Sequence, residues 1–339
     1  METHWVRPQW ALSLALHATV GVVSSVLALS APFPAAIAAA LAALSMAVEA
    51  AGRTGPLRRP LPRRATQNVL TVPDEEAGRD VTLLICARYD APRGGLVTRD
   101  GPRRLAARLR RRLGGRGLGP RAWIALALAA VALCAGLRAL GVEGFLLGLG
   151  QFVPTIALLC ALAAAGDIVV SPVSPGAGDN AAGVGVAVAL HQELTRNPPD
   201  ALNPALLLFG AGEGGPPAVR AHLRRERLDR ARVVVLELGP CGAGTPVYAT
   251  AHPQLRAACE HAADALGGAR TPLRRSSAAA AARGRRLPAA WVGALDADRI
   301  APRSRQPSDT LEHLDPAAGE AVLDFALACV DALDAELAR

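Results

Sequence analysis

Four long apolar runs constrain this 339-residue chain more than any other feature of its sequence. They cover Trp10–Ser30, Ala35–Ala51, Trp123–Leu137 and Phe145–Ala165. A helix needs about 20 apolar residues to cross the hydrocarbon core of a bilayer, and the first and fourth runs meet that length. The second and third runs are short and rich in alanine, so they also suit buried helices of a globular protein. Each short run is joined to a long one by a tight turn, which favours two transmembrane helical hairpins.

The positive charge of the chain lies between these two hairpins. All 37 basic residues are arginines, and segment 51–121 holds 17 of them with only six carboxylates. Because arginine-rich loops stay in the cytoplasm, this asymmetry predicts an integral membrane protein whose soluble domain is cytoplasmic. The rest of the chain is slightly acidic, and no aromatic residues are interleaved with the arginines. We therefore expect the lipid bilayer, and no nucleic acid, as a partner.

The densest arginine stretch is Arg103–Arg116, with the sequence RRLAARLRRRLGGR. A helix of this composition could lie on anionic lipid headgroups through its basic face. It could equally be a plain stop-transfer flank of the next apolar run. The sequence leaves both interpretations open.

The remaining sequence alternates between strand and helix patterns, which predicts an α/β sandwich. We expect segment 270–286, rich in alanine and arginine, to be a loop. Helices are expected at Pro217–Arg230, His252–Leu266 and Pro316–Ala338. Strands are expected at Val69–Val72, Val81–Ala87, Pro204–Phe209, Arg232–Leu238, Val247–Thr250 and Ala289–Leu295.

This pattern divides the chain into three parts. Residues 1–52 form an N-terminal transmembrane hairpin. Residues 66–92 and 168–339 form one discontinuous soluble domain of about 200 residues, a common domain size. Residues 93–167, the basic segment and the second hairpin, are inserted into it.

Polar residues gather where the predicted strands end. In open α/β sheets, ligands bind beyond the carboxyl ends of the strands. The segments concerned are CARYDAP, PGAGDNAAG, GAGEGG and VVVLELG, and RQPSDTLE follows later in the chain. They contain three carboxylates that we expect to converge: Asp179, Glu213 and Glu237.

In this order the five segments resemble the co-catalytic dizinc aminopeptidases, the family of bacterial leucyl aminopeptidases and glutaminyl-cyclase-like proteins. The resemblance covers the whole soluble part. It implies a three-layer α/β/α zinc-exopeptidase-like sandwich with a mixed sheet. It also implies that Asp179, Glu213 and Glu237 stand at metal-ligand positions. Asp90 and Asp309 match positions beside the ligands.

The departures from the family pattern carry more information than the matches. Two histidine ligands of the family are replaced by Arg88 and Arg305, and the general base is replaced by Gly212. A guanidinium stays protonated and cannot ligate zinc. Losing the base removes a further factor of roughly 100 to 10,000 in rate. The resemblance therefore implies a membrane-anchored pseudopeptidase, and no cofactor is expected.

We hypothesise that the two arginines supply, through ion pairs, the positive charge that two zinc ions would have provided. The role left to such a protein is binding or scaffolding, with a peptide or another membrane protein as partner. If the protein is active after all, zinc is the expected cofactor and the three carboxylates are its ligands.

Two alternative functions remain open. His191, His222 or His313 could supply a nitrogen ligand to an altered, active metal site. The glycines of GAGEGG could instead bind a dinucleotide, because they follow a strand, precede a helix and lie about 20 residues before an acidic residue. The residues of that second site would be Gly210, Gly212, Gly215 and Glu237.

Overall fold

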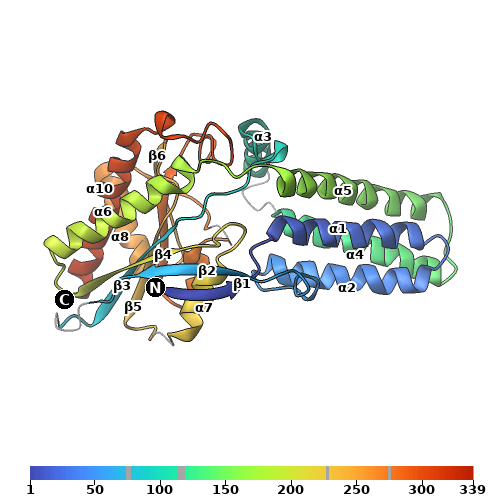
Figure 1. Cartoon of the computed structure of the whole chain (residues 1–339), viewed down its shortest axis with the longest axis horizontal. Coiled ribbons are helices and arrows are strands. Elements are labelled where there is room, and N and C mark those ends of the chain that lie inside the picture. The colour runs from blue at the N-terminus through green and yellow to red at the C-terminus, as the bar shows by residue number, and fades with distance from the viewer. Residues whose placement is uncertain (74–77, 113–118, 227–228, 274–275, 339) are drawn as a thin grey trace.

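A bundle of long helices projects from one end of a layered α/β structure (Figure 1). This computed structural model describes residues 1–73, 78–112, 119–226, 229–273 and 276–338. The bundle consists of α1 (Trp10–Leu27), α2 (Pro32–Ala50), α4 (Pro120–Ala139) and α5 (Phe145–Val170).

The layered part is built on one eight-stranded sheet with the order β1-β2-β4-β3-β5-β8-β6-β7. Parallel pairing joins β4, β3, β5 and β8, and also β6 and β7. The pairs β1–β2, β2–β4 and β6–β8 are antiparallel. The sheet is therefore mixed, as predicted. Its strands are β1 (Glu2–Val6), β2 (Arg64–Leu70), β3 (Val81–Arg88), β4 (Leu202–Phe209), β5 (Val233–Leu238), β6 (Thr245–Thr250), β7 (Ala269–Arg270) and β8 (Ala289–Leu295).

Helices cover both faces of the sheet. Alternate residues of each strand point to opposite faces, so each face has its own core. On one face α6 (Ala182–Arg196), α8 (Pro253–Leu266) and α10 (Pro316–Leu337) pack on the first core. On the other face α7 (Pro217–Arg225) and α9 (Ala278–Arg283) pack on the second. This three-layer α/β/α arrangement confirms the predicted fold class.

Two elements differ from expectation. Segment 270–286 was expected to be a loop, but it contains α9. Alanine has the highest helix propensity, and Ser277 caps the helix by accepting a hydrogen bond of 3.0 Å from the backbone N–H of Ala280. Burial of the α9 alanines against the sheet stabilises this short helix further. The edge strand β1 is also unforeseen; it pairs along its length with β2.

The four bundle helices are each long and apolar enough to cross a membrane. The two runs that are short in sequence extend into helices of 19 and 20 residues, because the helices also include flanking residues such as Pro32 and Pro120. A seam of alanine, leucine and other apolar side chains joins the four helices. Both hairpins therefore pack into one bundle.

The basic helix α3 (Asp100–Arg112) lies outside the bundle and packs on the α/β part (Figure 1). Asp298 makes ion pairs with Arg104, Arg108 and Arg111, at 3.2, 3.4 and 2.5 Å. Part of the positive charge on α3 is therefore balanced within the chain. Residues 113–116 of the dense arginine stretch lie outside the described residues.

Candidate functional site

A cavity of about 200 Å³ lies at the carboxyl ends of the central strands. Arg88 ends β3 and Phe209 ends β4, while Glu237 is the next-to-last residue of β5. Asp179 enters from η4 (Ala177–Ala181), the irregular turn before α6. All four residues line the cavity, together with Arg305. The sheet topology thus brings segments that are distant in sequence to one place.

Arg88 and Asp179 form an ion pair across the cavity wall. The Ser304 hydroxyl donates a second hydrogen bond, of 2.5 Å, to the other oxygen of Asp179. Burial alone would raise the pKa of Asp179, but the guanidinium groups of Arg88 and Arg305 lower it below the usual range. Burial lowers the pKa of Arg88, but the neighbouring carboxylates have the larger combined effect and raise it. Asp179 is therefore held as a buried carboxylate by positive charge from arginine.

A second ion pair joins Arg305 Nη1 to Glu213 Oε1 at 2.6 Å. The Arg305 guanidinium also lies over the ring of Trp10, 5.5 Å from its centre, in a cation–π contact. The backbone N–H of Arg93 donates to the other oxygen of Glu213 at 3.3 Å. Trp10 begins α1, so the first bundle helix contributes a side chain to this site.

Two further aspartates hold the backbone of the site. Asp309 accepts hydrogen bonds from the N–H groups of Gly178 and Asp179, at 2.6 and 3.2 Å. Asp90 accepts from the N–H groups of Gly212 and Glu213, at 2.8 and 3.2 Å. Each aspartate therefore fixes the loop that carries one of the arginine-paired carboxylates.

Glu237 has a different environment from the other two carboxylates. It is buried, and one oxygen accepts a hydrogen bond of 2.8 Å from the backbone N–H of Ala279, at the start of α9. Burial raises the pKa of Glu237 to about 7, against the opposing effect of these backbone hydrogen bonds and of Arg88. Glu237 therefore changes its protonation near neutral pH.

Gly212 stands where the resemblance places a general base. A Cβ atom on this residue would lie 2.3 Å from Cδ and 2.5 Å from Cγ of Arg88. These distances are far below van der Waals contact. The side chain of Arg88 therefore occupies the space that a glutamate at position 212 would need.

The same kind of contact explains the neighbouring glycines. A Cβ atom on Gly210 would lie 2.6 Å from the hydroxyl oxygen of Tyr89. One on Gly214, where φ is +73°, would lie 2.3 Å from the ring of Trp10. Packing against side chains of the chain itself thus accounts for Gly210, Gly212 and Gly214 without a bound pyrophosphate. Gly215 has open space around it, but its φ of +127° favours glycine.

The three histidines considered as alternative ligands lie elsewhere. Among the residues described, no histidine lines the cavity beside Asp179. His191 bonds to the Thr71 hydroxyl at 3.2 Å, and His313 bonds to that of Thr310 at 2.9 Å. His222 is buried and contacts a glutamate of β1.

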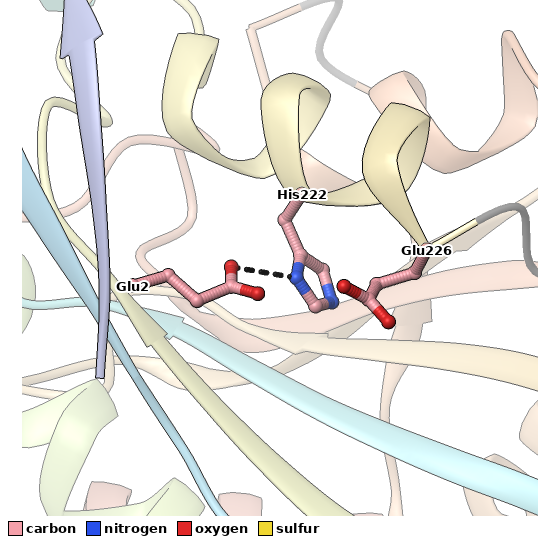
Figure 2. Close-up of side chains that lie close together, drawn as sticks. All are labelled: Glu2, His222 and Glu226. Carbon is pink, nitrogen blue, oxygen red and sulfur yellow. Dashed lines mark hydrogen bonds and ion pairs between the residues drawn. The ribbon is translucent and has the colours of Figure 1, made fainter.

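The surroundings of His222 contain possible metal ligands. Its Nδ1 atom lies 2.9 Å from Oε2 of Glu2, and Glu226 is on its other side (Figure 2). The ligand atoms of these three residues lie within 4.8 Å of one another. Burial opposes ionisation of Glu2, but hydrogen bonds from His222 and His4 lower its pKa. In this arrangement the Glu2–His222 pair ties β1 to α7.

The donor set beside Asp179 does not fit a dizinc centre. Zinc sites of proteins are built from cysteine, histidine and carboxylate ligands. Here two of the three carboxylates are engaged by guanidinium groups, which carry positive charge and offer no lone pair. We therefore derive no catalytic step through a metal.

Several residues of the site are absent from the sequence-based prediction. Trp10, Arg93 and Arg103 belong to segments assigned to the membrane or its flank. Arg103 lines the cavity and donates hydrogen bonds to the carbonyl oxygens of Ala301 and Ser304, at 3.0 and 3.1 Å. The sequence contains no signal for these contacts, because they depend on how the inserted segment folds back on the sheet.

No protein-family model matches the chain, and no curated protein matches its sequence. Among solved structures, a zinc aminopeptidase from Bacillus subtilis matches with a TM-score of 0.49 and 15% identity. That match covers 79% of this chain and 50% of the aminopeptidase, so the chain spans about half of that protein's length. In fold, the chain is similar to zinc aminopeptidases and glutaminyl cyclases.

In two further matches, this chain covers a larger share of the other protein. A glutaminyl cyclase from Bacteroides thetaiotaomicron has a TM-score of 0.48 and 11% identity, covering 78% of this chain and 77% of the cyclase. LapB from Legionella pneumophila has a TM-score of 0.46 and 11% identity, covering 98% of this chain and 78% of LapB.

Proposed function

We propose that this protein is a membrane-anchored, catalytically inactive relative of the dizinc aminopeptidases, and that its former metal site has a binding role. The two ion pairs, Arg88–Asp179 and Arg305–Glu213, are the observation that carries the proposal. Each places a guanidinium on a carboxylate that would otherwise be available to a metal. Breaking such a pair would leave a poorly solvated charge, so the arginines oppose metal binding.

Hydrolysis of a peptide by the family's chemistry needs an activated water molecule and a base. A bound metal supplies the first by lowering the pKa of water, and a carboxylate supplies the second. At this site the base position is Gly212, and its space is filled by Arg88. Neither requirement is met by the residues present.

The size and lining of the cavity suggest what it would bind. A volume of about 200 Å³ is below the range of roughly 300–1,000 Å³ typical of sites for drug-sized molecules. It suits a chain terminus or one side chain of a partner. Charged groups on its wall include Arg103 and Glu237, beside the apolar surface of Trp291. We therefore propose a peptide end, or a segment of a membrane-protein partner, as ligand.

The four apolar helices would anchor this site to a membrane with the α/β part in the cytoplasm. The 17 arginines of segment 51–121 support this orientation. Cysteine labelling in intact cells and inverted vesicles tests it. After Cys160→Ser removes an exposed thiol, a cysteine introduced by Glu336→Cys should react with an impermeant maleimide only in inverted vesicles. Reaction in intact cells would place the α/β part outside.

Restoring the family residues tests the loss of activity. The triple variant Arg88→His, Gly212→Glu, Arg305→His should gain zinc binding and cleave fluorogenic aminoacyl substrates, whereas the parent protein should do neither. A folded triple variant that binds no zinc would show that the site is wrongly assigned. Zinc-dependent cleavage by the parent protein, lost in Asp179→Asn, would overturn the proposed inactivity.

A further inference from the structure

A second and larger cavity, of about 950 Å³, lies where the helical bundle joins the α/β part. Its walls come from the end of α2, the start of α4, the chain after β1, and the helices α7 and α9. Among the described residues lining it are eight arginines but a single carboxylate, Glu49. We call it the arginine cavity, after Arg7, Arg53, Arg58, Arg63, Arg121, Arg220, Arg224 and Arg285.

These arginines have fewer acidic partners than those of α3, which pair with the three carboxylates of Asp100, Asp296 and Asp298. On α3, three guanidinium groups share the carboxylate of Asp298. In the arginine cavity, Glu49 faces Arg58 at 3.7 Å, the only ion pair to a lining arginine in the described part of the chain. One acidic group thus stands against eight basic ones.

Backbone carbonyl groups satisfy some of the arginine donors. Arg7 donates to the carbonyl oxygen of Leu61 at 2.9 Å, and Arg121 donates to that of Gly214 at 2.6 Å. Arg58 donates to the carbonyl of Arg7. Carbonyl oxygens orient the guanidinium groups but carry no net charge. The excess positive charge of the cavity therefore remains.

Part of this charge is held away from water at a cost in stability. The Nε atoms of Arg58 and Arg121 are buried and have no hydrogen-bond partner among the described residues. Burial lowers the pKa of Arg58 and of Arg220, and repulsion from neighbouring arginines lowers both further, although Glu49 opposes this at Arg58. Unpartnered donors and mutual repulsion are what an anion-binding site shows without its anion.

We propose that the arginine cavity binds a phosphate-bearing anion with two or more negative charges. A guanidinium presents donors in a planar fork that matches phosphate oxygens in pairs, and several arginines together favour a multivalent anion. An anion bound in the cavity would relieve the repulsion among the lining arginines. This cavity adjoins the one beside Asp179, with which it shares the lining residues Gly214 and Ser276, but its arginines are different ones. The proposal does not depend on the loss of catalysis.

The position of the cavity allows two sources for the phosphate. It lies beside Gly52, just past the end of α2, where a Cβ atom would stand 2.8 Å from Nη2 of Arg220. If the bundle crosses a bilayer, this level corresponds to the lipid headgroups. The phosphate could therefore belong to a phospholipid headgroup or to a soluble phosphorylated compound.

Binding can be tested on the full chain purified in neutral detergent. The soluble probes are inorganic phosphate and pyrophosphate, with thermal unfolding as the readout. The lipid probe is phosphatidic acid at increasing content in phosphatidylcholine nanodiscs. We expect the soluble probes, the lipid probe or both to raise the unfolding temperature of the protein. Stabilisation by the soluble probes identifies a soluble ligand, and stabilisation by phosphatidic acid alone identifies a headgroup.

Two matched double variants locate the site. Arg220→Gln with Arg224→Gln should weaken binding about tenfold or more, because two charged hydrogen-bond donors are lost. Removing repulsion should leave its unfolding temperature without ligand unchanged or higher. Arg110→Gln with Arg112→Gln, which changes two exposed arginines of α3, should bind as the parent does.

Three results would overturn the proposal. The first is that no probe raises the unfolding temperature of the parent protein. The second is that the Arg220→Gln, Arg224→Gln variant binds the probe as tightly as the parent. The third is that the Arg110→Gln, Arg112→Gln variant loses as much affinity as the cavity variant. The last result would place anion binding on α3 instead. If Arg220→Gln with Arg224→Gln does not fold, Arg53→Gln with Arg63→Gln changes only exposed lining residues and provides the same test.

Discussion

The side chain of Arg88 lies so close over Gly212 that a Cβ atom on residue 212 would stand 2.3 Å from Arg88 Cδ. Arg88 cannot simply swing away, because its guanidinium is paired with Asp179 inside the site. An arginine at position 88 and a larger residue at position 212 therefore exclude each other sterically. Arg88 in this position would clash with a glutamate at position 212, the residue that the family pattern has there.

Gly212→Ala should be more destabilising while Arg88 is present. The added methyl group forces the arginine out of its position, and overpacking of this kind costs typically about 1–3 kcal/mol. In the Arg88→Ala background most of this cost should disappear, because the Cγ and Cδ atoms of Arg88 are removed and only the 2.9 Å approach to Cε2 of Phe209 remains. Thermal unfolding of the four proteins of this double-mutant cycle measures the coupling. Additive effects would show that the two residues do not compete for space.

Removing Arg88 should leave Asp179 as an unbalanced buried charge. We expect Arg88→Met to lower the free energy of unfolding at pH 7 by about 3 kcal/mol, in the range for broken buried pairs. Because positive charge lowers the pKa of Asp179, the stabilisation it provides is present above the ordinary carboxyl pKa and is lost as the pH falls. Arg88→Met combined with Asp179→Asn should recover most of the loss. No recovery would mean that Arg88 acts mainly through packing.

Glu237 should make stability depend on pH in the opposite sense. Its pKa of about 7 in the folded protein lies above the ordinary value of 4.5. Between these values the folded chain keeps a proton that the unfolded chain loses, so the free energy of unfolding falls as the pH rises and levels off above about 7. Glu237→Gln should remove this slope and stabilise the protein at pH 8, by on the order of 3 kcal/mol.

The matched control for Glu237 is Glu312→Gln, which changes an exposed glutamate. Its unfolding curve should follow that of the parent at every pH. A metal bound to Glu237 would instead keep it ionised and abolish the slope in the parent protein. A flat parent profile between pH 5 and 8 would therefore contradict the environment described for Glu237.

Much of the layered fold can be predicted from local sequence. The buried strands β3, β5 and β8 are short runs of apolar residues between polar or glycine-rich segments, and each lies close to its predicted bounds. The edge strand β1 is different, because only one of its five residues is buried and its apolar pattern is weak. Its place depends on pairing with β2, which no local pattern reveals.

The candidate site can also be predicted in part from the sequence. Residues at the carboxyl ends of parallel strands must meet, so the segments that carry Arg88 and Glu237 could be placed together from sequence. The steric relation between Arg88 and Gly212 could not, because it depends on side-chain conformation. Nor could the contact of Trp10 with Arg305, which arises from packing of the bundle against the sheet.

The docking of α3 should depend on Asp298. Hydrogen bonds from Arg111, Arg108 and Arg104 lower the pKa of Asp298 to about 2, so the contribution of these ion pairs is present above the ordinary carboxyl pKa and is lost only as the pH falls toward 2. Asp298→Asn should increase amide hydrogen exchange across Asp100–Arg112 at pH 7, while Asp229→Asn, an exposed control, should not. High salt should have the same effect as Asp298→Asn. Unchanged exchange in Asp298→Asn would mean that other contacts hold α3.

The central claim, that Arg88 and Arg305 have taken the place of metal, is tested most directly by the zinc content of the full-length protein. The protein is purified in detergent, equilibrated with micromolar zinc, passed through a desalting column and analysed by mass spectrometry for metals. We predict that the parent retains no more zinc than its Asp179→Asn variant, whereas the Arg88→His, Gly212→Glu, Arg305→His variant retains more. One or two zinc ions per parent chain, lost in Asp179→Asn, would contradict the account.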